Sequence, residues 1–159
     1  MFNIIVNKEY ELLFERLKAE APDSFALTLA DFSHPDEKLN VLLEKADAII
    51  GQVNPSDSQY KTAGRLRIIQ TMSAGYDRID LTKAKHHNVL VASNNGANAV
   101  SVAEHVLMQI FVLYRQLLFH HRSVTSGPWK NLKHTNKEFA GKTLGIFGLG
   151  RIGKALAKR

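Results

Sequence analysis

Short apolar runs alternate with amphipathic segments along the first 95 residues. The runs are rich in Ile, Val and Leu, as buried strands are, and apolar residues recur at helical spacing between them. Strand, helix and strand in repetition predict βαβ units, a parallel sheet and right-handed crossovers. Five strands within ~95 residues fit an α/β fold with a flavodoxin-like doubly wound parallel sheet. The predicted strands are Phe2–Val6, Phe25–Leu29, Asp47–Gly51, Leu66–Gln70 and Val89–Ala92, and the predicted helices are Tyr10–Glu20, Leu39–Lys45 and Leu81–His87.

The strongest helical pattern begins near Ser101. Ser101 and Glu104 have the spacing of a capping box, in which each side chain accepts a hydrogen bond from the other residue's backbone N–H. Apolar residues then recur at helical spacing from Ala103 to Leu117, in a broad stripe. Such a helix needs cover on more than one side, so we expect it at a junction between two domains or two subunits.

The segment after this helix is polar and ends in a glycine motif. Residues 119–141, which include Gly127-Pro128, show little periodicity, and we interpret them as a connecting loop. Thr143–Phe147 is a sixth strand candidate that runs directly into Gly148–Gly153, and a helix is expected from Lys154 to Arg159. The motif G-x-G-x-x-G carries weight where it follows a strand and opens a helix, and this pattern predicts both.

Each glycine of the motif has a physical role in dinucleotide binding. Gly148 permits a tight turn, Gly150 lets a diphosphate approach the backbone, and Gly153 lets the helix pack against the strand. The helix N-terminus attracts an anion, and Arg151 offers a charged contact to phosphate. We therefore expect a cofactor site at the motif, for NAD or NADP, or a glycine-rich turn without a ligand. The expected cofactor-binding residues in the motif are Gly148, Leu149, Gly150, Arg151, Ile152 and Gly153.

Composition narrows the class of protein. The chain has 159 residues, of which 45% are hydrophobic and 23% charged, as in globular proteins, and it has no cysteine. Met1 to Tyr10 lacks the features of a secretory signal, and the apolar runs are shorter than a membrane span, so a cytoplasmic protein without a membrane partner is expected.

Charge is divided unevenly along the chain. Residues 1–110 carry a net charge of −3, and residues 111–159 carry +9. The basic residues stand singly, and Trp129 has few aromatic neighbours in sequence, so base stacking is not indicated. We expect the basic half to meet an anionic ligand or acidic residues elsewhere, and no nucleic acid; a salt-sensitive gel shift would favour nucleic acid instead.

Three segments, in order, resemble signatures of the D-isomer-specific 2-hydroxyacid dehydrogenase family, whose members include glyoxylate and hydroxypyruvate reductases. Thr71–Leu81 is similar to its substrate loop, Asn98–His105 to its interdomain hinge, especially in formate and phosphoglycerate dehydrogenases, and Phe139–Phe147 to the entry of its cofactor domain. The resemblance implies a substrate-binding domain at residues 1–97. Residues 98–159 would then form an interdomain helix and the truncated start of a Rossmann NAD(P)-binding domain.

The resemblance also implies roles for individual residues. Backbone N–H groups of Ser73, Ala74 and Gly75 would bind the carboxylate of a small organic acid, as consecutive amides in a turn can. An ordinary turn with Gly75 at positive φ is the alternative. Asn98 would lie beside the substrate, or be a plain turn residue, and Val102 would abut the nicotinamide, or simply pack in the helix.

The resemblance places the catalytic residues of such an enzyme beyond the segments that match here. Members of this family use an Arg and a His supported by an acid, all after the glycine motif, so we assign no catalytic residue here. The adjacent pairs His86-His87 and His120-His121 make poor metal sites and are interpreted as solvated surface. The expectation is therefore an inactive fragment, lacking the catalytic Arg, Glu and His, of an NAD(P)-dependent oxidoreductase that acts on D-2-hydroxy acids and forms a homodimer. A non-catalytic, dinucleotide-sensing scaffold of corepressor type is the alternative.

Overall fold

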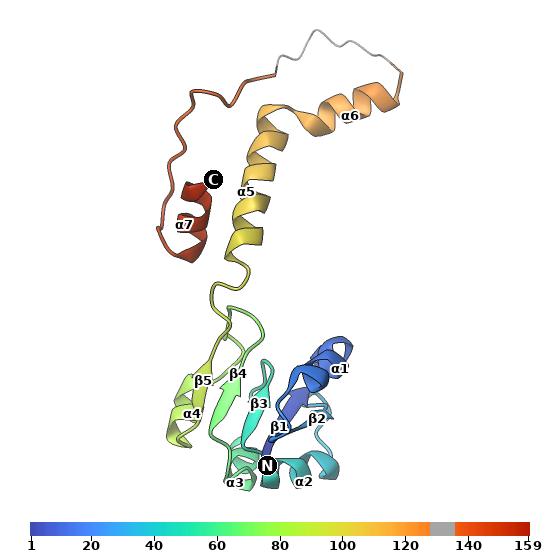
Figure 1. The fold of residues 1–159 in the computed structure, drawn as a ribbon, viewed down its shortest axis with the longest axis vertical. Coiled ribbons are helices and arrows are strands. Elements are labelled where there is room, and N and C mark those ends of the chain that lie inside the picture. The colour runs from blue at the N-terminus through green and yellow to red at the C-terminus, as the bar shows by residue number, and fades with distance from the viewer. Residues whose placement is uncertain (128–135) are drawn as a thin grey trace. The chain divides into compact units, whose positions relative to one another are not determined.

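A five-stranded parallel sheet organises the first part of the chain, with strand order β2-β1-β3-β4-β5 (Figure 1). This is the flavodoxin-like order, so the predicted fold class is confirmed. The computed structural model describes residues 1–127 and 136–159. Pro128, part of the predicted loop, and Trp129, considered for base stacking, lie outside the described residues. The strands are β1 (Phe2–Asn7), β2 (Phe25–Ala30), β3 (Ala48–Ile50), β4 (Ile68–Gln70) and β5 (Leu90–Ala92).

The described residues divide into two compact units, Met1–Asn95 and Gly96–Arg159. The first unit holds the sheet and its helices, and the second holds the remaining helices. The helices of the first unit are η1 (Lys8–Tyr10), α1 (Glu11–Glu20), α2 (Glu37–Lys45), α3 (Asp57–Thr62) and α4 (Leu81–His86). Those of the second unit are α5 (Ala99–Tyr114), α6 (Leu117–Thr125) and α7 (Arg151–Lys158).

Hydrophobic side chains cover both faces of the sheet, because successive residues of a strand point to opposite faces. Ile5 in β1 belongs to a cluster with Leu43 of α2 and Tyr60 of α3. Its neighbours Ile4 and Val6 belong to a second cluster, packed against α1. A parallel sheet buried on both faces explains why its strands are continuous apolar runs in the sequence.

Side-chain caps fix the starts of three helices in the first unit. Asp36 accepts a hydrogen bond from the N–H of Leu39 at α2, and Asp80 accepts one from Lys83 at α4. Helix α3, which the apolar pattern did not predict, has a complete capping box of Ser56 and Gln59. The spacing S-x-x-Q at positions 56–59 is the sequence signal that could have revealed it.

Helix α5 starts earlier than predicted, and its capping box is absent. Asn98 is the N-cap, and its carbonyl oxygen accepts from the N–H of Val102, so Ser101 lies within the helix. Glu104 instead pairs with Arg159, at 2.9 Å from Oε1 to Nη2. The predicted box was wrong because the chain already turns at Gly96, whose carbonyl accepts from Ala99.

Two further predictions for the second unit were wrong. Residues 119–125, predicted as part of a loop, belong to helix α6, which begins at Leu117 after a break at Gln116 with a left-handed φ of 44°. Thr143–Phe147 is not a strand, because a strand needs a hydrogen-bonded neighbour and none is found among the described residues. The tight turn at Gly148 and the helix after it are confirmed, although the helix starts at Arg151.

Within the described ranges, no single helix is long and apolar enough to cross a membrane. Helices α5 and α6 together have the length and apolar composition of a membrane span, but they are bent by 60° at the break between them.

Candidate functional site

The loop after β4 is held in place by hydrogen bonds from three directions. Thr71 is fully buried, and its hydroxyl donates to the carbonyl of Ser73 at 2.6 Å. The same carbonyl accepts from the N–H of Asn94, after β5, at 3.0 Å. The Ser73 hydroxyl donates to the carbonyl of Gly75 at 3.0 Å and accepts from the amide of Gln52, after β3. These contacts give the loop a fixed backbone.

The carbonyl oxygens of Ser73 and Gly75 accept hydrogen bonds, whereas the N–H groups of this loop are available. In the part of the chain that the structure describes, nothing accepts a hydrogen bond from the N–H groups of Ser73, Ala74 or Gly75. Successive free amides favour an anion such as a carboxylate. The alternative of a turn with Gly75 at positive φ is wrong, because Gly75 is not among the residues with positive φ.

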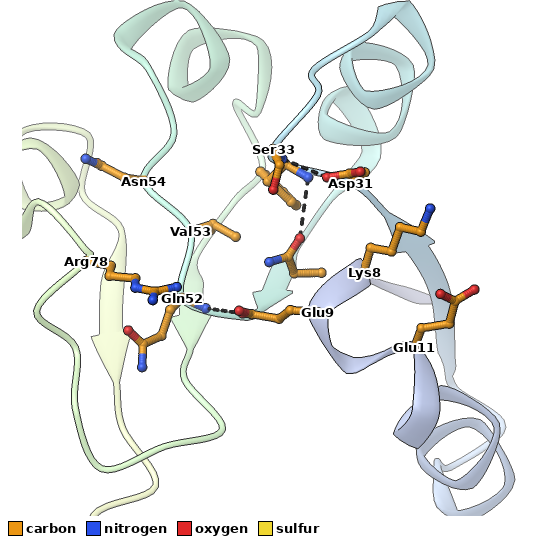
Figure 2. Close-up of a pocket in the computed structure, with 11 residues that line it drawn as sticks. Lys8, Glu9, Glu11, Asp31, Ser33, Gln52, Val53, Asn54 and Arg78 are labelled. Carbon is orange, nitrogen blue, oxygen red and sulfur yellow. Dashed lines mark hydrogen bonds between the residues drawn. The ribbon is translucent and has the colours of Figure 1, made fainter.

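A pocket of about 570 Å³ lies at the same edge of the sheet (Figure 2). It forms where the chain leaves β1 and β3, the point at which strand order reverses and where ligands of such sheets bind. Glu9 Oε1 accepts from the N–H of Gln52 at 3.0 Å, so Gln52 links this pocket to Ser73. Its lining includes Lys8, Glu9, Glu11, Asp31, Gln52 and Arg78.

None of these pocket residues was among the site residues predicted from the sequence. Their sequence signal is positional: Gln52 directly follows one predicted strand and Lys8 comes two residues after another, and the carboxyl ends of these strands meet at one edge of the sheet. The backbone N–H of Ser33 and then the His34 ring hold the pKa of Asp31 below its usual range. Burial and the neighbouring Glu9 raise the pKa of Tyr10, so its phenol stays neutral.

Two expected site residues lie at the start of α5. Asn98 is exposed, and as N-cap it makes no capping hydrogen bond with its side chain. Its amide is therefore available to a ligand. Val102 is half-buried on the first turns of the same helix.

The glycine motif forms a bend that leads directly into α7. Gly148 has a φ of 94°, and a side chain added at Gly148 or Gly150 would meet open space. Gly153 is buried, and a methyl group there would overlap the carbonyl oxygen of Gly148. No side chain caps α7, so its first N–H groups point outward beside the bend. Leu149 and Ile152 flank the glycines and are exposed.

These residues fit a dinucleotide diphosphate on geometric grounds. Space above Gly148 and Gly150 admits a ligand close to the backbone, and the uncapped helix offers donors with a partial positive charge. Arg151 is exposed at the first position of α7.

The structure places the expected residues in two groups. Ser73, Ala74 and Gly75 come together in the first unit. The second unit holds Asn98 and Val102 on α5 and Gly148, Leu149, Gly150, Arg151, Ile152 and Gly153 around α7. Helices α5 and α7 lie side by side (Figure 1).

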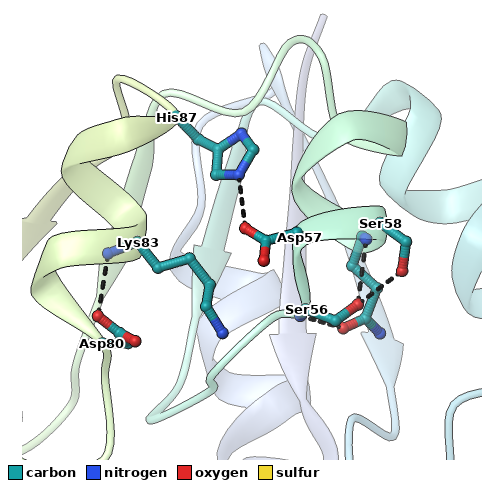
Figure 3. Close-up of polar contacts among 7 residues, drawn as sticks. Ser56, Asp57, Ser58, Asp80, Lys83 and His87 are labelled. Atoms are coloured by element: carbon teal, nitrogen blue, oxygen red, sulfur yellow. Dashed lines mark hydrogen bonds and ion pairs between the residues drawn. The ribbon is translucent and has the colours of Figure 1, made fainter.

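His87 is a further polar centre, on the first unit. Its Nε2 lies 3.0 Å from Oδ1 of Asp57 (Figure 3). Its ring also stacks on that of Tyr60, with the ring centroids 4.8 Å apart. The side chain is 15% exposed, so its interpretation as solvated surface was wrong. The hydrogen bond from His87 lowers the pKa of Asp57, and the pair joins α3 to the end of α4. Among the described residues no group of acidic and histidine side chains could hold a metal ion.

Comparison with known proteins finds relatives of this chain. A family model described as D-isomer specific 2-hydroxyacid dehydrogenase, catalytic domain, matches residues 7–148. Formate dehydrogenase 2, mitochondrial, of Oryza sativa subsp. japonica is 37% identical over 133 residues, which are 77% of this chain and 35% of the relative. D-3-phosphoglycerate dehydrogenase of Archaeoglobus fulgidus is 34% identical over 125 residues, 77% of this chain and 24% of the relative.

A solved structure of a related dehydrogenase is also similar to this chain. NAD-dependent formate dehydrogenase from Staphylococcus aureus, in complex with NAD, aligns with a TM-score of 0.64 and 29% identity. The alignment covers 99% of this chain and 52% of that chain. The chain thus spans roughly half or less of the length of these relatives.

Proposed function

Because the chain belongs to the D-isomer-specific 2-hydroxyacid dehydrogenase family, we propose that it forms the substrate-binding part of an NAD(P)-dependent oxidoreductase. The whole enzyme interconverts the CH–OH group of a small D-2-hydroxy acid and the carbonyl of a 2-oxo acid, as a glyoxylate or hydroxypyruvate reductase does. The observation that carries this proposal is the glycine bend at Gly148 and Gly150, which leads into α7 without a side-chain cap, in a chain whose loop after β4 also offers free amides.

The substrate is bound through its carboxylate in this proposal. The N–H groups of Ser73, Ala74 and Gly75 donate to the carboxylate oxygens, and the hydrogen bonds of Thr71 and Gln52 keep the loop in that conformation. Asn98 contributes a side-chain amide, which can donate or accept.

The cofactor is bound through its diphosphate. Gly148, Leu149, Gly150 and the first turn of α7 donate backbone N–H groups, Arg151 adds a positive charge, and Val102 offers an apolar surface to the nicotinamide. Ile152 lies on the first turn of α7 beside the cofactor, and Gly153 lets the helix pack close to the bend. When bound, the nicotinamide supplies or accepts the hydride. The proposed cofactor is NAD or NADP.

The arrangement of the whole protein belongs to the same proposal. Residues 1–97 form the substrate domain, and residues 98–159 form an interdomain helix and the beginning of a Rossmann cofactor domain. The full-length protein is a homodimer. The expected cytoplasmic location stays a prediction, since the rice relative is mitochondrial by name.

We further propose that the 159 residues bind ligands without turnover. The family resemblance assigns the catalytic Arg and the His with its acid to positions after the glycine motif. Incubation with glyoxylate or hydroxypyruvate and NADH or NADPH is therefore expected to leave the absorbance of the reduced cofactor unchanged. Steady oxidation of the cofactor by the purified chain would contradict this.

Cofactor binding is tested with two glycine variants. Gly153→Ala places a methyl group against the Gly148 carbonyl, so it should open the bend and raise the Kd for NADH or NADPH at least ~10-fold. Gly145→Ala is the matched control, because a methyl group there meets no atom within 4 Å. Fluorescence of the reduced nucleotide measures both.

Each outcome of this titration has a defined meaning. Loss of affinity in Gly153→Ala with a normal Gly145→Ala supports the cofactor bend. Equal affinity in all three proteins, or no binding of either nucleotide by the unmodified chain, contradicts it.

A further inference from the structure

Arg151 lies in an unusual electrostatic position within the second unit. It is the first residue of α7, where the helix end is already partly positive, so a cation is unfavourable there. No carboxylate among the described residues pairs with its guanidinium, whereas Arg159 at the opposite end of α7 pairs with Glu104. Something other than an ion pair must therefore determine where the Arg151 side chain lies.

Gly96 provides that determinant. It precedes α5 with a φ of 90°, and its carbonyl accepts the N–H of Ala99 at 3.1 Å. A methyl group on Gly96 would overlap Cδ of Arg151 and would lie 3.0 Å from Nε and 3.1 Å from Nη1. The arginine side chain thus packs directly on the bare backbone of Gly96, in space that any other residue would fill.

We propose that Gly96 is a positioning residue, which holds the Arg151 guanidinium beside the glycine bend for the diphosphate of a dinucleotide. This inference rests on the proposed function for the identity of the anion. A side chain at position 96 would push Cδ away, and because arginine is flexible, the protein would fold while its charge moved from the bend.

The test compares Gly96→Ala with two controls of similar backbone strain. Gly127 and Gly141 have φ values of 115° and 70°, on either side of that of Gly96, and a methyl group at either meets no atom of the described residues within 4 Å. Alanine at all three positions is strained at positive φ, but alanine at position 96 alone displaces Arg151.

Affinity is measured with NADH and with inorganic pyrophosphate by calorimetry. Gly96→Ala should weaken both about 5- to 10-fold, as expected when one charged contact is lost. Gly127→Ala and Gly141→Ala should stay within about twofold of the unmodified chain. In an Arg151→Ala background, Gly96→Ala should cause no further loss, because the two changes remove the same contact.

A second readout needs no ligand. The Arg151 Nε–H resonance, assigned by its disappearance in Arg151→Lys, should shift in Gly96→Ala and stay in place in both controls. Failure of the unmodified chain to bind either probe would contradict the proposed cofactor site, and the resonance would still decide the role of Gly96. An unshifted resonance, or equal losses of affinity in all three glycine variants, would overturn the inference.

Discussion

Asp47 shows how a single buried charge is stabilised in the first unit. It is 5% exposed, and its Oδ2 accepts the N–H of Asn3 at 2.9 Å. Its Oδ1 accepts from Arg65, at 3.0 Å from Nη2. The Asn3 N–H first, and then Arg65, hold the pKa of Asp47 below its usual range, although burial opposes them. Asp47 thereby joins the start of β1 to the segment before β4.

Removing this carboxylate should destabilise the fold. Asp47→Ala leaves the Asn3 N–H without an acceptor and should lower the free energy of unfolding by about 1–3 kcal/mol, with a smaller loss in Asp47→Asn. Urea denaturation at pH 7 measures the difference. Asp23→Asn, at an exposed acid, is the control and should change little.

The same carboxylate predicts a pH dependence. The folded pKa lies below the unfolded value of about 3.9, so the stabilisation is complete above that value and is lost as pH falls through the folded pKa. Asp47→Asn should therefore differ from the unmodified chain at pH 7 and converge with it in acid. Parallel stability curves down to the folded pKa would contradict this assignment.

At the scale of elements, local signals predicted some boundaries and missed others. The apolar runs predicted all five strands. In β1 and β3 most residues are buried, which makes such a strand recognisable in one short stretch of sequence, whereas β2 and β5 are half-buried or exposed but still largely apolar. Helix α3 was missed because Tyr60 is the one residue that this described helix buries, and its clearest sequence signal is its capping box. The strand expected at Thr143–Phe147 needs a partner, and pairing is not visible in a local pattern.

Site residues follow the same rule. The loop at residues 73–75 and the glycine bend at residues 148–153 are each one continuous stretch of sequence, so the residues of each were predicted together. Gln52 was missed because its partner Ser73 is 21 positions away. The packing of Arg151 on Gly96 likewise depends on tertiary structure, because the two residues are far apart in sequence and no local pattern predicts their contact.

The capping box of α3 gives a prediction at this scale. Ser56→Ala removes the acceptor for the Gln59 N–H and should cost about 0.5–2 kcal/mol of stability. Ser58→Ala is the matched control, because Ser58 contacts Ser56 through its hydroxyl but does not cap the backbone. Thermal denaturation compares the two, and equal losses would argue against the capping role.

Amide exchange tests the absence of a sixth strand. Leu144 is 41% exposed and Phe147 fully exposed, so the amides of Thr143–Phe147 should exchange quickly. Ile49 and Ile69, in β3 and β4, are fully buried and should be strongly protected. Hydrogen exchange followed by mass spectrometry resolves these segments; equal protection would mean that residues 143–147 are paired after all.

At the scale of the whole molecule, the two units differ in how much they bury. The first has a continuous core on both sides of its sheet. In the second, Ala99, Ala103 and Gly153 are buried, whereas large apolar residues such as Leu113 and Leu118 are exposed on α5 and α6. Exposed apolar surface of this kind marks an interaction site or an aggregation hazard.

This difference predicts unequal stability. The first unit should resist limited proteolysis, while cleavage should concentrate in residues 136–159 outside α7, where few backbone hydrogen bonds protect the chain. Mass spectrometry of the fragments tests this. A protease that first cuts between β1 and β5 would contradict the prediction.

The strand order has a consequence for synthesis on the ribosome. Every strand after β1 pairs with one that precedes it in the chain: β2 and β3 with β1, β4 with β3, and β5 with β4. No strand has to wait for a partner that is translated later. Once Ile50 has left the ribosome, a nascent chain can already enclose β1 between β2 and β3, which removes both edges of β1 from contact with other polypeptides before the second unit has been made.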